Sequence, residues 1–199
     1  MAQIYCVIDC SGSMEPYVDR TISGFNEFIQ SSNRGSEFSL ILFNDVVDVV
    51  YENKMIENVK PLDNTTYIPR GWTALLDGVG KAVELAEKFE SKSGADEKSV
   101  IVLIMPDGQE NSSTKYTQPQ ITSLIAEKKR LGWDFIFMGA NQDAIQTASE
   151  FSIDQRTSLT FDTNNVSDAF RSASSAIERS QRGDNIYFTP TERSASLNP

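Results

Sequence analysis

The order of apolar segments along this 199-residue chain predicts an α/β fold with a mainly parallel sheet and one antiparallel edge strand. Short apolar runs of strand length alternate with longer segments in which apolar residues recur every three or four positions, as in helices that pack on a sheet. Two of the runs, residues 4–8 and 100–105, are apolar throughout, which is typical of strands buried on both faces. The length suits a single domain with one core.

The first half of the chain is expected to supply three strands, over residues 4–8, 38–43 and 46–51. The first is central, and the third is an antiparallel edge strand that follows a tight turn. Ser13 is expected to cap the first helix, whose apolar face recurs at helical spacing. The polar segment 52–70 is predicted to be a surface connection, and Thr73 stands where it meets the second helix.

The second half is expected to supply three more strands, over residues 100–105, 133–138 and 159–161. Helices are predicted over about 119–131, over 142–151 and across the apolar positions 166, 170, 173 and 177, with a turn at 139–141. Beyond about residue 179 the chain is polar with scattered Gly, Pro and Ser. We therefore assign residues 1–180 to one domain and predict that residues 181–199 are a mobile tail.

Five oxygen-bearing side chains are predicted to meet at the carboxyl edge of the sheet, where open α/β folds bind ligands: Asp9, Ser11, Ser13, Thr73 and Asp107. Oxygen-only ligands suit Mg²⁺, Mn²⁺ or Ca²⁺ and argue against Zn²⁺ or Cu²⁺. A single Ser or Thr at a helix start is more typical of a cap, so the prediction of a metal site depends on the full set. Water or a ligand oxygen would have to complete the coordination shell.

The residues 9–14, Asp-Cys-Ser-Gly-Ser-Met, resemble the Asp-x-Ser-x-Ser signature of von Willebrand factor type A domains. Thr73, within Gly-Trp-Thr, and Asp107, within Pro-Asp-Gly, are similar in order and context to the later Thr and Asp of that family's metal-ion-dependent adhesion site. The resemblance covers roughly residues 3–178, and residues 135–145 further resemble a stand-alone bacterial and phage branch. Pro106 departs from the family pattern, in which many members carry Thr or Ser.

The resemblance implies a Rossmann-like, doubly wound sheet with helices on both faces and a Mg²⁺-type ion at its carboxyl edge. It further implies that Ser11 and Ser13 bind the ion directly, that Thr73 does so in the ligand-bound state, and that Asp9 and Asp107 act through water. The open coordination position would then take an acidic residue, Asp or Glu, of a partner protein.

The amino-acid composition argues against several classes of function. The net charge of −10 disfavours nucleic acid as a direct partner, and no apolar run is long enough to span a membrane. The two cysteines, Cys6 and Cys10, lie too close along one segment to staple a fold, so we expect a cytoplasmic protein. The chain has no histidine, which removes the commonest general base and the commonest zinc ligand.

The leading hypothesis is therefore a non-enzymatic, divalent-metal-dependent protein-binding module. The alternative is a metal-dependent hydrolase or phosphotransferase that uses the same ion as a Lewis acid, and a third possibility is an ion that only stiffens the sheet edge. For three further features we prefer an interpretation without a functional role. We expect that Trp72 packs in its loop, that Cys10 is not a redox thiol, and that the basic run 128–130 ends a helix.

Overall fold

A six-stranded sheet forms the centre of the computed structural model, which describes residues 2–93, 99–140 and 144–197. The strand order is β3-β2-β1-β4-β5-β6, and every neighbouring pair is parallel except β2 and β3. The strands are β1 (Ala2–Asp9), β2 (Glu37–Phe43), β3 (Val47–Met55), β4 (Ser99–Met105), β5 (Asp134–Ala140) and β6 (Ser158–Phe161). The predicted fold class, with its antiparallel edge strand, is confirmed.

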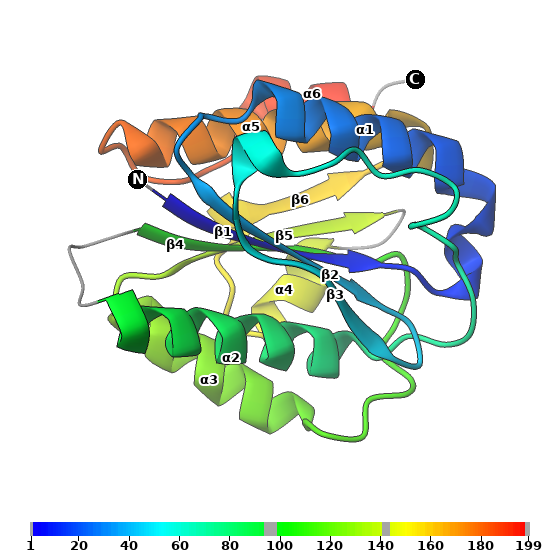
Figure 1. Ribbon diagram of the computed structural model, residues 1–199, viewed down its shortest axis with the longest axis horizontal. Helices are drawn as coiled ribbons and strands as arrows, with labels where there is room; N and C mark the ends of the chain where they lie inside the picture. The colour runs from blue at the N-terminus through cyan, green and yellow to red at the C-terminus, as the bar shows by residue number, and fades with distance from the viewer. Residues whose placement is uncertain (1, 94–98, 141–143, 198–199) are drawn as a thin grey trace.

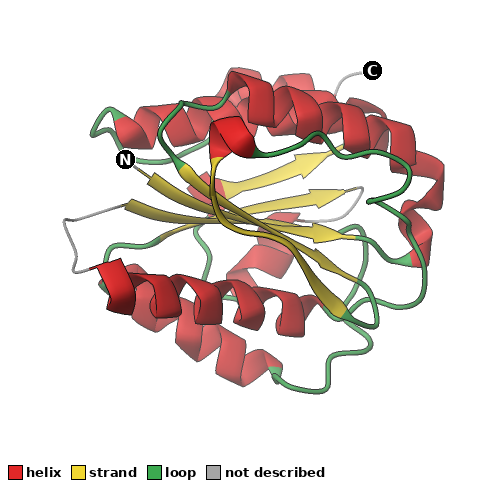
Figure 2. Ribbon diagram, in the orientation of Figure 1, coloured by secondary structure: helices red, strands yellow, loops and turns green. Residues whose placement is uncertain are grey.

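Helices cover both faces of the sheet (Figures 1 and 2). One face carries α1 (Val18–Ser31), α5 (Val166–Gln181) and α6 (Pro190–Leu197); the other carries α2 (Leu75–Ser93), α3 (Gln118–Arg130) and α4 (Ala144–Glu150). Alternate residues of β1 enter the two cores, with Ile4 and Ile8 on the α1 side and Tyr5 and Val7 on the α2 side. This two-sided burial explains why the strand reads as a continuous apolar run.

Several predicted element boundaries are wrong. β3, predicted to end at residue 51, continues to Met55, into the segment predicted to be a surface connection. Gly139 and Ala140, predicted as a turn, belong to β5, because they pair in parallel with Thr160 and Phe161 of β6. Ser13 does not cap an α-helix: it lies inside a 3₁₀ helix, Gly12–Tyr17, that precedes α1. The residues 141–143, which include the end of the predicted turn and the start of the predicted short helix, lie outside the described part of the chain.

The segment for which we predicted a tail contains a helix, α6, that the sequence analysis missed. The Arg179 guanidinium pairs with Glu192 at 2.8 Å, and the Asp162 N–H donates to the Ser196 carbonyl at 2.9 Å. Arg193 donates to the carbonyl of Ser158, the first residue of the edge strand β6, at 2.7 Å. Because these contacts are polar, the sequence of α6 has no apolar residues at helical spacing from which the helix could be predicted. Among the described residues, no helix is long and apolar enough to cross a membrane.

Candidate metal centre

The carboxyl ends of β1 and β4 place Asp9 and Asp107 beside each other. The two strands pair in parallel up to Ile8 and Met105, so Asp9, the last residue of β1, and Asp107, two residues beyond β4, lie at the same edge of the sheet. The Asp9 side chain is fully buried, and its two oxygens accept backbone N–H groups from Ser11 at 2.8 Å and from Asp107 at 3.0 Å. A carboxylate held in this way is oriented before any ligand arrives, which suits a role through metal-bound water.

Two serine hydroxyls lie next to this carboxylate. Ser11 is buried and Ser13 is exposed, and their Oγ atoms are 3.1 Å apart. The 3₁₀ turn, in which the Met14 N–H donates to the Ser11 carbonyl at 3.0 Å, brings these alternate residues onto one side. Adjacent oxygens of an octahedral shell with metal–oxygen distances of about 2.1 Å are about 3.0 Å apart. The pair therefore fits two neighbouring positions around Mg²⁺.

Asp107 completes a ring of four contacts. Burial raises the pKa of the Asp107 carboxyl, while a hydrogen bond from the Ser13 side chain acts to lower it. Burial likewise raises the pKa of Asp9, hydrogen bonds from Ser11 and from the Asp107 backbone act to lower it, and the Asp107 charge adds to the increase. Two neighbouring acids with raised pKa values form a site in which a cation is favourable.

The donor set is rich in hydroxyls rather than in soft ligands. No group of three or more His, Cys, Asp or Glu side chains that could hold a metal lies among residues 2–93, 99–140 and 144–197. Cys10 is buried, and burial raises the pKa of its thiol to about 11, so it stays protonated at neutral pH. A hard, water-carrying ion fits these residues better than zinc does.

Thr73 reaches the same edge from the loop before α2. Its side chain is buried, and its loop is tied to the serine turn by the Gly12 N–H, which donates to the Gly71 carbonyl at 3.1 Å. The Thr73 N–H donates to the Asn111 side-chain oxygen at 2.8 Å. Within the described part of the chain, the Thr73 hydroxyl makes no hydrogen bond to the other four candidate ligands. The structure thus connects four of the five directly and brings the fifth to their border.

Three residues that support this edge escaped the sequence analysis. The hydroxyl of Tyr67, a buried residue of the segment predicted to be a surface connection, donates to the Asp9 carbonyl at 2.6 Å. Asn111 and Glu110 hold the loop after β4 against the start of α2. The apolar residues Ile56, Val59 and Leu62 of that segment, which are buried as Tyr67 is, signalled that it is more than a surface connection, but not which group Tyr67 contacts. The polar residues of the β4–α3 loop carried no comparable signal.

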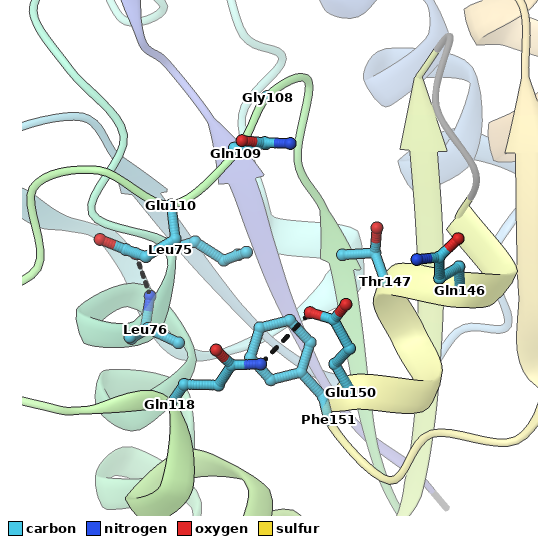
Figure 3. Close-up of a pocket in the computed structure, with 10 residues that line it drawn as sticks. All are labelled: Leu75, Leu76, Gly108, Gln109, Glu110, Gln118, Gln146, Thr147, Glu150 and Phe151. Carbon is cyan, nitrogen blue, oxygen red and sulfur yellow. Dashed lines mark hydrogen bonds between the residues drawn. The ribbon is translucent and has the colours of Figure 1, made fainter.

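A groove of about 440 Å³ opens beside the candidate centre, between the start of α2 and α4 (Figure 3). Its lining includes two carboxylates, and both are already engaged. Glu110 accepts the Leu76 N–H at 3.0 Å, at the first turn of α2, and Glu150 accepts the side-chain amide of Gln118 at 3.2 Å. Neither stands as an unpaired acid or base at the groove.

The other expectations have mixed outcomes. Trp72 does not pack in its loop: 68% of it is exposed, so that prediction is wrong. Lys128 lies in the last turn of α3 and pairs with Glu87 and Glu127, which confirms the interpretation of the basic run as a helix end. Asp77 accepts backbone N–H groups from the loop at 114–116 and supports that loop from α2.

Comparisons with known proteins agree with this architecture. A family model described as the von Willebrand factor type A domain matches residues 3–182. No curated protein matches the sequence. Among solved structures, proximal thread matrix protein 1 from the mussel byssus, with a zinc-occupied metal-ion-dependent adhesion site (MIDAS) motif, is 18% identical with a TM-score of 0.64, covering 87% of this chain and 44% of its own.

Two bacterial structures are similar at the same level. A von Willebrand factor type A protein from Catenulispora acidiphila is 17% identical with a TM-score of 0.59, covering 88% of this chain and 42% of its own. The protein BatB from Bacteroides thetaiotaomicron is 11% identical with a TM-score of 0.62, covering 92% and 100%. At these identities the likeness shows the fold alone. The chain spans less than half of the mussel and Catenulispora chains.

Proposed function

Because the chain belongs to the von Willebrand factor type A domain family, we propose that it is a divalent-metal-dependent protein-interaction module that captures an acidic residue of a partner protein. The observation that carries the proposal is the ring of contacts that joins Asp9, Ser11, Ser13 and Asp107 at the end of β1 and β4. Side chains from two separate strands are already arranged around one point. An ion bound there would supply an electrophilic position for a carboxylate.

Each residue has a distinct part in this proposal. Ser11 and Ser13 hold the ion through their hydroxyls, since their 3.1 Å separation suits neighbouring ligand positions. Asp9 and Asp107 orient bound water, and the backbone N–H groups of Ser11 and Asp107 already hold the Asp9 carboxylate in place for this role. Thr73 joins when the partner binds. The MIDAS motif of the mussel protein holds zinc, but the oxygen-only donors here favour Mg²⁺ or Mn²⁺, with Ca²⁺ as the other hard ion.

The proposal includes no catalysis and no nucleic-acid or membrane partner. The chain has no histidine, and the carboxylates of the neighbouring groove, Glu110 and Glu150, are hydrogen-bonded. The net charge of −10 opposes binding to phosphate backbones. Cys6 and Cys10 are both buried and unpaired, which supports placement in a reducing compartment such as the cytoplasm.

Isothermal titration with MgCl₂ and MnCl₂ tests the metal site. We expect one ion to bind per chain and no binding heat from a Ser11→Ala/Ser13→Ala double variant. A matched control, Ser123→Ala/Ser149→Ala, removes two exposed hydroxyls from α3 and α4 and should bind as the unaltered chain does. The proposal fails if the unaltered chain binds neither ion or if the Ser11/Ser13 variant binds equally well.

A further inference from the structure

Three large apolar side chains are exposed on the two segments, 44–46 and 68–74, that backbone hydrogen bonds tie to each other and to the serine turn. Trp72 is 68% exposed, Val46 56% and Ile68 54%. Trp72 directly precedes the candidate ligand Thr73, and Ile68 lies in the same loop. Val46 stands in the turn between β2 and β3. Folding does not bury these three side chains, so they do not contribute to the packing of the apolar core.

The loop that carries Trp72 is held by its backbone. The Trp72 N–H donates to the Asp45 carboxylate at 2.8 Å, and the Arg70 N–H donates to the Cys10 carbonyl at 2.9 Å. Gly71 has a φ of +68°, and a Cβ there would lie 1.9 Å from a carboxylate oxygen of Asp45, so only glycine fits this approach. The exposed Trp72 therefore stands on a preorganised loop.

The turn that carries Val46 belongs to the same structure. The Val46 N–H donates to the Asn44 side-chain oxygen at 2.9 Å, and the Asn44 carbonyl accepts the Ala74 N–H at 2.9 Å. Asn44 and Asp45 thus tie the β2–β3 turn to the loop at 68–74. A surface that is already ordered loses little conformational entropy when a partner binds.

We propose that Val46, Ile68 and Trp72 form an apolar crest that binds a large apolar residue of the partner, next to the acidic residue that the metal centre takes. Trp is enriched among the residues that dominate binding energy at protein interfaces. The exposed Arg70, between Ile68 and Trp72 in the chain, adds a positive charge that complements an acidic segment. The partner is thus a protein segment in which Asp or Glu adjoins an aromatic or large aliphatic residue.

This inference rests on the proposed function, because the metal centre places the acid. A displayed library of random twelve-residue peptides, selected on the Mg²⁺-loaded protein and eluted with EDTA, tests both. We expect the eluted peptides to combine an acid with a neighbouring aromatic or large aliphatic residue. Synthetic copies should lose about tenfold or more in affinity for Trp72→Ala, and Trp72→Phe should restore most of it.

The chain supplies a matched control and a direct readout. Leu131, which is 66% exposed just after α3, allows a Leu131→Ala control that removes a similarly exposed apolar residue elsewhere. Of the two tryptophans, Trp133 is only 5% exposed, so iodide quenching of fluorescence reports mainly on Trp72 and should decrease when a peptide binds. Mg²⁺ titration of Trp72→Ala should match the unaltered chain.

The possible failures are distinguishable. EDTA-eluted peptides that bind Trp72→Ala as tightly as the unaltered chain would overturn the apolar crest and leave the metal-dependent function standing. A library that yields no EDTA-eluted peptide would contradict the proposed function, and the crest would fall with it. Acidic peptides without a neighbouring large apolar residue would also count against the crest.

Discussion

Asn111 and Thr73 are joined by two hydrogen bonds that run in opposite directions. The Thr73 N–H donates to the Asn111 side-chain oxygen at 2.8 Å, and the Asn111 N–H donates to the Thr73 carbonyl at 3.1 Å. The loop that follows Asp107 therefore fixes the position of Thr73 on the neighbouring loop. The loops that carry the candidate ligands Thr73 and Asp107 are therefore coupled through the Thr73–Asn111 pair.

Asn111 is not a candidate metal ligand, but removing its side chain should alter the position of Thr73. We expect Asn111→Ala to weaken Mg²⁺-dependent peptide binding about tenfold, since residues that orient metal ligands commonly have effects of this size. Titration calorimetry measures the change. Asn64→Ala, an exposed residue of the loop before Thr73, is the control and should have no effect. Equal affinities for both variants would show that Asn111 does not position Thr73 for binding.

The Tyr67 hydroxyl should contribute to the stability of the fold rather than to the binding of an ion or a partner. Its buried hydroxyl donates to the Asp9 carbonyl at 2.6 Å, so Tyr67→Phe removes a hydrogen bond from beneath the centre. We expect a loss of about 1–2 kcal/mol in the free energy of unfolding, measured by urea denaturation. Tyr187→Phe, at a side chain that is partly exposed, is the control and should be near neutral. A Tyr67→Phe variant as stable as the unaltered chain would contradict this role.

The sequence was sufficient to place the acids but not their supports. Asp9 and Asp107 could be located because each follows a continuous apolar run, and parallel strands end at one edge. Tyr67 and Asn111 could not, because they act across 58 and 38 residues of sequence, on contacts that exist only after the loops have folded together. No local periodicity records such contacts.

Ser13 shows a different limit of sequence analysis. Its position before an amphipathic helix predicted a cap, but the chain first makes a 3₁₀ turn, and the hydroxyl lies 3.1 Å from that of Ser11 instead. Propensity rules could not separate the two outcomes, because a capping serine and a ligating serine occupy the same kind of position in the sequence. That both hydroxyls bind an ion stays a prediction.

The docking of α6 should depend on pH through Glu192. Burial alone would raise the pKa of Glu192, but hydrogen bonds from Arg179 and Thr189, together with the Arg179 charge, lower it below its usual value. A carboxylate with a lowered folded-state pKa stabilises the fold above its unfolded-state pKa, and the benefit is lost as pH falls through the folded-state value. The contribution of Glu192 to stability is therefore lost as the pH falls below about 4.3.

Glu192→Gln tests this contribution directly. At neutral pH we expect the variant to lose about 1–3 kcal/mol in the free energy of unfolding, because a hydrogen-bonded ion pair with little exposure is removed. The difference from the unaltered chain should shrink as pH falls below about 4. Glu178→Gln breaks an exposed ion pair with Arg182 and should cost no more than about 0.5 kcal/mol. Equal losses in both variants would contradict the docking role.

Metal addition distinguishes an interaction site from an ion that only stiffens the sheet edge. The ring at Asp9, Ser11, Ser13 and Asp107 is held by its own hydrogen bonds, so we expect the protein in EDTA to remain folded. Mg²⁺ at a hundredfold excess over its Kd should then add about 2.7 kcal/mol, the value that mass action requires. Thermal unfolding, compared with the Kd from calorimetry, measures this. The Ser11→Ala/Ser13→Ala variant should show no shift, whereas a chain that unfolds in EDTA would assign the ion a structural role.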